Sequence, residues 1–174
     1  MRSAIGLGER EVTTFSAGIL LFRFRSGKLE VMLVHPGGPF WAHRDDGVWS
    51  IPKGLPEDDE NPLDTARREF KEETGFAVDG EFIDLGERNQ SSVKTVHAWA
   101  LEKDLDVTNI VSNTITYEWP RNSGNIQEIP EVDKAGWFDI GLAKRKIIKG
   151  QIGFLNALIG VINHSQKEKH SDKG

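Results

Sequence analysis

Three closely spaced glutamates, Glu69, Glu72 and Glu73, are the residues of this chain best suited to do chemistry. Glu69 is three residues from one of them and four from the other, and residues at these spacings can share one face of an α-helix. Like charges gathered on one face repel each other. We therefore expect the face to need a cation.

The donor chemistry indicates which cation this would be. The chain has no cysteine, and no histidine lies near these glutamates in the sequence. An all-oxygen set of ligands favours Mg²⁺ or Mn²⁺ over zinc or copper. Magnesium commonly takes further ligands from substrate phosphates, and a metal in such a site lowers the pKa of a bound water. A phosphate or polyphosphate ester attacked by water is the substrate that these residues favour. Glu69 is a candidate general base or metal ligand, and the adjacent Arg68 could orient it through an ion pair.

The surrounding residues predict a loop that leads into a helix of about three turns. Asn61 before Pro62 is typical of an N-cap followed by proline at the first helical position, and Gly75 is placed to end the helix. Apolar residues three and four apart form a stripe that we expect to be buried, on a different side of the helix from the acids. The stripe consists of Leu63, Ala66 and Phe70.

An acidic helix that also carries Arg67 and Lys71 is often just a solvated face. The wider spacing from Gly54 to Phe76 favours a functional interpretation, because it resembles the Nudix box, the signature of the Nudix hydrolase family. The positions that match this signature are Gly54, Glu60, Arg68, Glu69, Phe70, Glu72, Glu73, Gly75 and Phe76. So many specified positions make a chance match improbable.

The resemblance implies an α/β class, the Nudix α/β/α sandwich, over about Phe15 to Ile162. It also implies hydrolysis of a nucleoside diphosphate linked to another group, with Mg²⁺ or Mn²⁺. The implied metal ligands are Glu69, Glu72, Glu73 and the backbone carbonyl of Gly54. Glu60 and Arg68 would support the loop and orient the acids, with Arg68 counted among the catalytic group.

Family members often add a carboxylate from outside the box, as a metal ligand or as the general base. Glu131, which shortly precedes Gly136-Trp137-Phe138, is the best match, and Glu128 is the second. We expect both in an irregular loop that spans residues 125–133. Each could equally be a solvated loop acid.

Residues outside the box must select the substrate. Pro52-Lys53-Gly54 resembles the sequence that leads into the box in diadenosine polyphosphate and diphosphoinositol polyphosphate hydrolases, where the lysine can meet a phosphate. This favours a longer polyphosphate, although an exposed loop lysine is often only a solubilising charge. Trp41 is our preferred residue for stacking on a nucleobase. The other candidates are His35, His43, His97, Tyr117 and Trp119, while Trp99 and Trp137 are expected in the core. Arg44 and Lys94 are candidates for phosphate contacts or for solvated charges.

The remaining pattern predicts a mixed β-sheet covered by a helix on each face. The predicted strands are Phe15–Phe24, Leu29–His35, Trp49–Ile51, Ala77–Glu87, Ser92–Glu102, Ile115–Trp119 and Gly136–Phe138. Asp139 is expected to cap a helix that begins near Gly141, and a last helix is expected over Gln151–Ile162. These elements form a single domain over residues 14–163, with flexible ends at 1–13 and 164–174.

Composition fits a single soluble enzyme domain. The chain has 174 residues and a formal net charge of −5, which disfavours a surface for nucleic-acid polymers. The lack of cysteine excludes disulfides and is consistent with the cytoplasm, and no stretch resembles a signal peptide or a membrane span. We expect a monomer or homodimer whose partners are small nucleotides or polyphosphates.

Two functions follow. The first is a Mg²⁺-dependent pyrophosphohydrolase that cleaves a phosphoanhydride of a nucleoside triphosphate or a dinucleoside polyphosphate, such as a diadenosine tetraphosphate-like compound. The second is a Nudix-fold module that binds a nucleotide or an ADP-ribose-like ligand without hydrolysing it. Silent modules can lose the glutamates, and here all three are present. The enzyme is therefore favoured.

Overall fold

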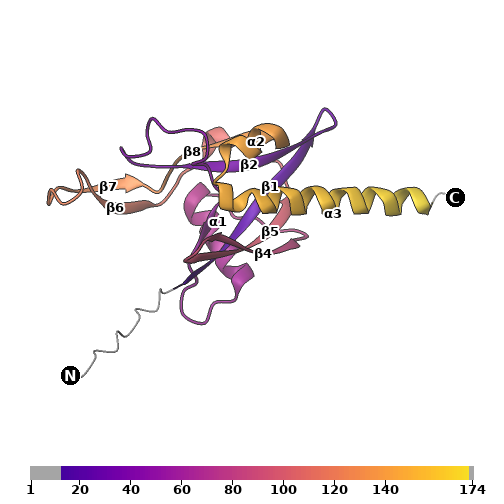
Figure 1. Ribbon diagram of the computed structural model, residues 1–174, viewed down its shortest axis with the longest axis horizontal. Coiled ribbons are helices and arrows are strands. Elements are labelled where there is room, and N and C mark those ends of the chain that lie inside the picture. The colour runs from indigo at the N-terminus through magenta and orange to yellow at the C-terminus, as the bar shows by residue number, and fades with distance from the viewer. Residues whose placement is uncertain (1–12, 173–174) are drawn as a thin grey trace, which may run out of the picture.

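The computed structural model describes residues 13–172 and is built on a six-stranded mixed sheet (Figure 1). Its strand order is β4-β5-β1-β2-β8, and the short β3 also pairs with β1. The β1·β5 pair is parallel and the other pairs are antiparallel. The strands are β1 (Thr14–Arg25), β2 (Lys28–Pro36), β3 (Lys53–Gly54), β4 (Ile83–Ser91), β5 (Lys94–Glu102) and β8 (Val132–Asp139).

Helices and one separate hairpin complete the fold. The α-helices are α1 (Pro62–Thr74), α2 (Ile140–Lys146) and α3 (Ile152–Ser171), and short 3₁₀ turns cover Val107–Asn109 and Lys149–Gln151. The hairpin pairs β6 (Thr114–Glu118) with β7 (Ile126–Pro130). It projects from one end of the molecule, while α3 runs past the sheet at the other end (Figure 1).

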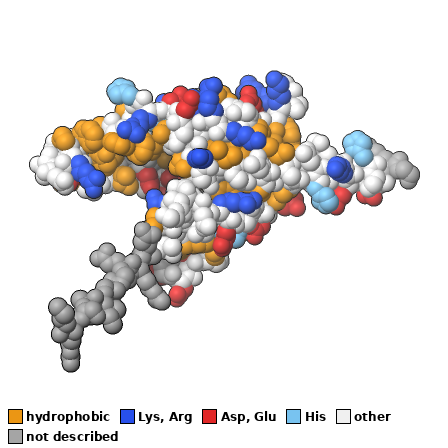
Figure 2. All heavy atoms as spheres, viewed as in Figure 1, with side chains coloured by type: hydrophobic (Ala, Val, Ile, Leu, Met, Phe, Trp, Pro, Cys, Tyr) orange, Lys and Arg blue, Asp and Glu red, His pale blue; other side chains and the backbone are white. Residues whose placement is uncertain are grey.

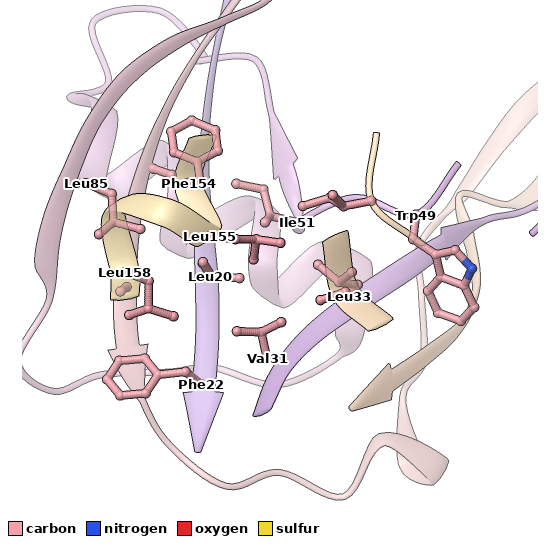
Figure 3. Close-up of a cluster of buried hydrophobic side chains, with 14 of the residues drawn as sticks. Leu20, Phe22, Val31, Leu33, Trp49, Ile51, Leu85, Phe154, Leu155 and Leu158 are labelled. Atoms are coloured by element: carbon pink, nitrogen blue, oxygen red, sulfur yellow. The ribbon is translucent and has the colours of Figure 1, made fainter. Parts of the chain in front are cut away.

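Alternate residues of β1 face two separate cores, as the two-residue period of a strand requires. Leu20 and Phe22 pack with Phe154, Leu155 and other residues of α2 and α3 (Figure 3). On the opposite face, a second core joins strand residues to α1; its members include Ala17, Ile19, Leu21, Ala66 and Phe70. The sheet therefore lies between two helical layers, which confirms the expected α/β/α sandwich.

Helix α1 begins and ends where the sequence predicted. The Asn61 side chain accepts a hydrogen bond from the Asp64 amide at 2.9 Å. Gly75 ends the helix in the left-handed conformation, at φ 81°, and its amide donates to the Lys71 carbonyl. Because glycine adopts this conformation without steric cost, it suits the position after the last turn.

One expectation about α1 is wrong. Glu69 and Glu73 are buried together with the apolar stripe rather than on a separate side of the helix. They continue the row that begins at the buried Thr65, four residues before Glu69, and this row adjoins the row of Ala66 and Phe70. Only Glu72 of the three acids is half-exposed.

Several element boundaries also differ from the prediction. Residues 77–82 are not strand, and β4 starts at Ile83. The expected loop over residues 125–133 contains β7 and the first residues of β8, because residues 126–130 pair with β6. Only Ile129 of β7 is buried, so this strand lacks the alternation of apolar residues that would predict it. Trp49 and Ser50 form isolated bridges rather than a strand.

The two chain ends were predicted to be flexible. Residues 1–12 lie outside the described part of the chain. At the other end, α3 does not stop near Ile162 but continues through the polar residues to Ser171. Residues 164–171 of this extension are exposed. Hydrogen bonding within the helix continues there without a buried apolar face.

Hydrophobic side chains gather at the end of the molecule where the β6-β7 hairpin lies (Figure 2). Phe40, Ile115 and Ile126 are among the exposed large hydrophobic residues. Of the helices within residues 13–172, none combines the length and the apolar character that crossing a membrane requires.

The core under α3 gives a first prediction. Phe154 is completely buried, so Phe154→Ala should lower the free energy of unfolding by about 3–5 kcal/mol through lost transfer energy and a cavity. Asn156→Ala, on the exposed side of the same helix, should change it by less than about 0.5 kcal/mol. Urea unfolding followed by circular dichroism measures both. Equal effects of the two substitutions would contradict the packing described.

Candidate functional site

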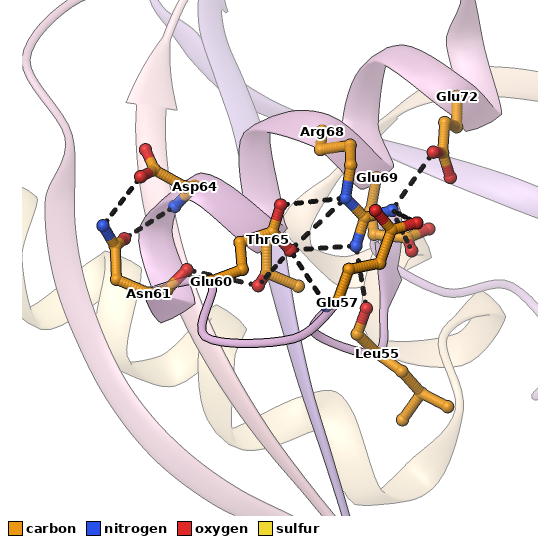
Figure 4. Close-up of polar contacts among 9 residues, drawn as sticks. All are labelled: Leu55, Glu57, Glu60, Asn61, Asp64, Thr65, Arg68, Glu69 and Glu72. Atoms are coloured by element: carbon orange, nitrogen blue, oxygen red, sulfur yellow. Dashed lines mark hydrogen bonds and ion pairs between the residues drawn. The ribbon is translucent and has the colours of Figure 1, made fainter.

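The Arg68 guanidinium is the cation around which the acidic groups of the box gather (Figure 4). Its Nη1 lies 2.9 Å from Glu69 Oε1 and 3.1 Å from Glu72 Oε1. Its Nε donates to Glu60 at 3.0 Å, and its Nη2 donates to the Leu55 carbonyl at 2.8 Å. One side chain thus joins the loop before α1 to two of the three helix glutamates.

Glu60 anchors this arrangement from the loop. Hydrogen bonds from Arg68 and from the Thr65 hydroxyl, at 2.7 Å, lower the pKa of Glu60 to about 2. The hydrogen bonds of Arg68 to Glu60, and then those to Glu69 and Glu72, raise the pKa of Arg68. Both groups remain charged at neutral pH, so the loop stays tied to the helix.

Gly54 approaches the Glu69 carboxyl too closely for any other residue. A Cβ built on Gly54 would lie 2.0 Å from Glu69 Cδ. Strand β3 fixes this approach, because Gly54 pairs with Ala17 and Lys53 with Gly18 of β1. On the same strand, the Lys53 amide donates to Glu73 Oε2 at 2.7 Å. The two residues of β3 therefore place backbone next to the carboxylates of Glu69 and Glu73.

Burial changes the acidity of these two carboxyls. Glu69 is 8% exposed and Glu73 is 6% exposed. Desolvation raises the pKa of Glu69, against the opposing effect of Arg68. Desolvation also raises the pKa of Glu73 well above the usual value, and the charges of Glu131 and Glu69 add to the effect. Holding both groups ionised requires additional positive charge.

Two adjacent cavities open onto the carboxylates, and Lys53, Lys94 and Glu131 line both. The first has a volume of about 450 Å³ and includes Glu69 and Glu72 in its lining. The second has a volume of about 430 Å³ and includes Glu73 and Trp41. Burial lowers the pKa of Lys53, and the nearby charge of Lys94 also lowers it. Two lysines therefore lie in the same region as the acids.

The structure brings most of the predicted site residues together. Glu131 lies between β7 and β8, where its amide donates to the Asn113 carbonyl and its carbonyl accepts from the Gly37 amide. Its charge acts on both Glu69 and Glu73. Glu128, the second candidate, is exposed, binds the Thr114 hydroxyl and lines neither cavity.

Arg44 is not in this group. Its guanidinium lies 4.3 Å from the centre of the Phe40 ring and 5.6 Å from that of Trp41, and its side chain is exposed and lines neither cavity. His35 and Tyr117 are also absent from both linings, and His35 is fully buried. The Arg44 cation therefore lies near the exposed Phe40 ring and the half-buried Trp41 ring, outside both linings.

Sequence reasoning missed Gln90 and Asn113, which line the second and the first cavity respectively. Gln90 accepts a hydrogen bond from the buried Gln151, whose Oε1 accepts from the Ile51 amide. Gln151 thereby links β4 to the segment that precedes Lys53. An amide in a polar stretch carries no motif, so only the folded arrangement identifies these residues.

The donor set fits a hard divalent cation in its chemistry, because it consists of carboxylates and the backbone carbonyl of a glycine that closely approaches one of them. Within residues 13–172, however, no three acidic or histidine side chains converge tightly enough to hold a metal. Arg68 binds Glu69 and Glu72, while Glu73 accepts from the Lys53 amide. Side-chain rearrangement would have to accompany metal binding.

Comparison with known proteins identifies the family of this chain. The family model of the NUDIX domain matches residues 12–158. The NUDIX domain of Shewanella oneidensis NrtR, solved with ADP ribose, aligns with a TM-score of 0.59 at 15% identity, over 88% of this chain and 90% of that one. A Caenorhabditis elegans Ap4A hydrolase binary complex aligns at 0.57 and 20% identity, over 87% and 99%. A mutT/nudix family protein from Listeria innocua aligns at 0.59 and 17% identity, over 90% and 98%.

The buried acids generate a prediction about stability. The pKa of Glu73 is higher in the folded than in the unfolded chain, so this carboxyl favours folding below the usual glutamate value of about 4.3, and the benefit disappears as the pH rises. With a chelator present to remove metal, the Glu73→Gln variant should therefore unfold at a higher urea concentration than the unmodified protein at about pH 8. The gain should shrink towards about pH 4.

The exposed Glu81→Gln serves as the matched control for this comparison, and it should unfold at the urea concentration of the unmodified protein at both pH values. A Glu73→Gln variant that is less stable at about pH 8 would show that the carboxylate is not under electrostatic stress in the folded chain.

Proposed function

We propose that this chain, which belongs to the NUDIX domain family, is a metal-dependent pyrophosphohydrolase that cleaves a phosphoanhydride bond of a nucleoside triphosphate or a dinucleoside polyphosphate. One observation carries the proposal. Two buried glutamates of α1 and the carboxylate of Glu131 border the same cavities as Lys53 and Lys94. Acids that favour a metal therefore lie beside cations that favour phosphates.

In this proposal, Glu69, Glu72 and Glu73, the Gly54 carbonyl and Glu131 hold Mg²⁺ or Mn²⁺. The bound cation would neutralise phosphate charge and acidify water. Arg68 orients Glu69 and Glu72 through the ion pairs already described. Burial raises the pKa of Glu69 and Glu73 in the absence of a cation, so the metal would keep both carboxylates ionised. One of the site carboxylates would accept the proton of the attacking water.

The substrate class follows from what lies beyond the acids. Lys53 and Lys94 line both cavities, so a polyphosphate that extends from one cavity into the other would meet two ammonium groups. Trp41 lines the second cavity and offers an aromatic face to a nucleobase. A chain of three or more phosphates with a base at one end suits this arrangement better than a single phosphate ester.

A panel of substrates tests the reaction. We expect hydrolysis of nucleoside triphosphates or diadenosine polyphosphates with Mg²⁺ or Mn²⁺, none with excess chelator, and recovery on adding the metal back. The other compounds in the panel are oxidised nucleotides, nucleotide sugars, ADP-ribose and diphosphoinositol phosphates. Glu73→Gln should reduce turnover by at least about 10²-fold, the range of general acid–base contributions. Tight binding of a nucleotide or ADP-ribose without turnover would instead support the binding module.

The lysines test the choice of a polyphosphate. Lys53→Met and Lys94→Met should each raise KM by about tenfold to a hundredfold, because a hydrogen bond to a charged group contributes about 1.5–3 kcal/mol. The control is Lys71→Met, an exposed residue of α1 that lines neither cavity, and it should leave KM unchanged. If none of the three substitutions changes KM relative to the unmodified protein, the two lysines do not bind the substrate.

A further inference from the structure

His35 is a completely buried polar side chain whose two ring nitrogens both face oxygen atoms. Its Nδ1 lies 2.9 Å from Asp133 Oδ1 of β8, and its Nε2 lies 2.6 Å from the Arg44 carbonyl oxygen. These contacts connect strand β2 to two other segments, the chain of residues 37–48 and the first residues of β8.

The two contacts hold a ring that solvent does not reach. The Arg44 carbonyl oxygen only accepts, so His35 Nε2 donates to it. The Nδ1 atom of the same ring meets the carboxyl group of Asp133. The buried ring is therefore held from both sides.

We propose that His35, through its contacts with the Arg44 carbonyl and with Asp133, acts as a positioning residue for the second cavity. This inference rests on the proposed function only where it concerns the substrate. The segment of residues 37–48 supplies Trp41, Gly47 and Val48 to the cavity lining, and the start of β8 supplies Val132. His35 binds both segments at once, and the Gly37 amide strengthens the connection by donating to the Glu131 carbonyl.

The charged groups around His35 support this assignment. The Trp49 ring packs edge-on against His35, with ring centres 5.1 Å apart, and Lys134 of β8 lies 5.6 Å from the centre of the Trp49 ring. Trp49 donates to Asp45, which also binds Lys146 of α2. Among the described residues, Asp133 is the acidic group that touches the histidine itself, and it is partly open to solvent.

The first test needs no substrate. In the full-length protein, ¹⁵N nuclear magnetic resonance should show a proton on His35 Nε2, the ring nitrogen that faces the Arg44 carbonyl. A His35 ring without a proton on Nε2 would overturn the proposal.

The second test compares the same substitution at two histidines. His35→Gln leaves one acceptor without a donor, whereas His43 is an exposed residue of the same segment and lines neither cavity. Hydrogen exchange of the Arg44 amide, which donates to the Trp41 carbonyl, should speed up at least tenfold in His35→Gln and remain unchanged in His43→Gln. Equal exchange in both variants would overturn the positioning role.

The kinetic measurement separates this role from a general loss of structure. His35→Gln should raise KM about tenfold for the substrate found in the panel and change kcat less than twofold, because the segment lines the cavity without touching the box acids. A loss confined to kcat would overturn the proposal. If the panel shows no hydrolysis, the proposed function fails, while the resonance and exchange results still decide the role of His35. If His35→Gln does not fold, the Nε2 proton of the unmodified protein decides the role of His35.

Discussion

The ion pairs of Arg68 are the interaction on which the candidate site depends. This one guanidinium binds Glu60 from the loop and Glu69 and Glu72 from helix α1. Without it, the loop would lose its charged anchor and several carboxylates would lie together with no fixed cation. It does not reach Glu73, which accepts from the Lys53 amide instead. That carboxyl, buried and next to other acids, is the most electrostatically stressed group of the site.

Pairing of the strands brings further residues next to these charged groups. Strand β1 pairs with β3 at one end, which places Gly54 against Glu69, and with β5 along its length, which places Lys94 opposite Thr14. Strand β8 begins next to Glu131 on the far side of β2. Residues distant in sequence therefore border two shared cavities. In the proposed function, selectivity depends on these outer segments, while α1 carries Glu69, Glu72 and Glu73.

The sequence predicted α1 to the residue because its signals are local. Asn61, Pro62 and Gly75 act on the residues beside them, and the spacing of Ala66 and Phe70 follows directly from helical geometry. The burial of Glu69 and Glu73 could not be predicted, because it depends on where β3 passes. Strand β7 also replaced part of an expected loop, because only Ile129 of this strand is buried and its sequence lacks the alternation of apolar residues that predicts a strand. The position of Arg44 has no local signal either, because its guanidinium lies near the rings of Phe40 and Trp41. A contact between Arg44 and a phosphate stays a prediction.

In the proposed function, the buried carboxylates of Glu69 and Glu73 bind a divalent cation. Titration with Mn²⁺, followed by the electron paramagnetic resonance signal of the free ion, measures this without any substrate. At about pH 8, the unmodified protein should bind Mn²⁺ and Glu73→Gln should bind it at least tenfold more weakly. Equal binding by both proteins, or no binding at millimolar Mn²⁺, would contradict this metal-binding role.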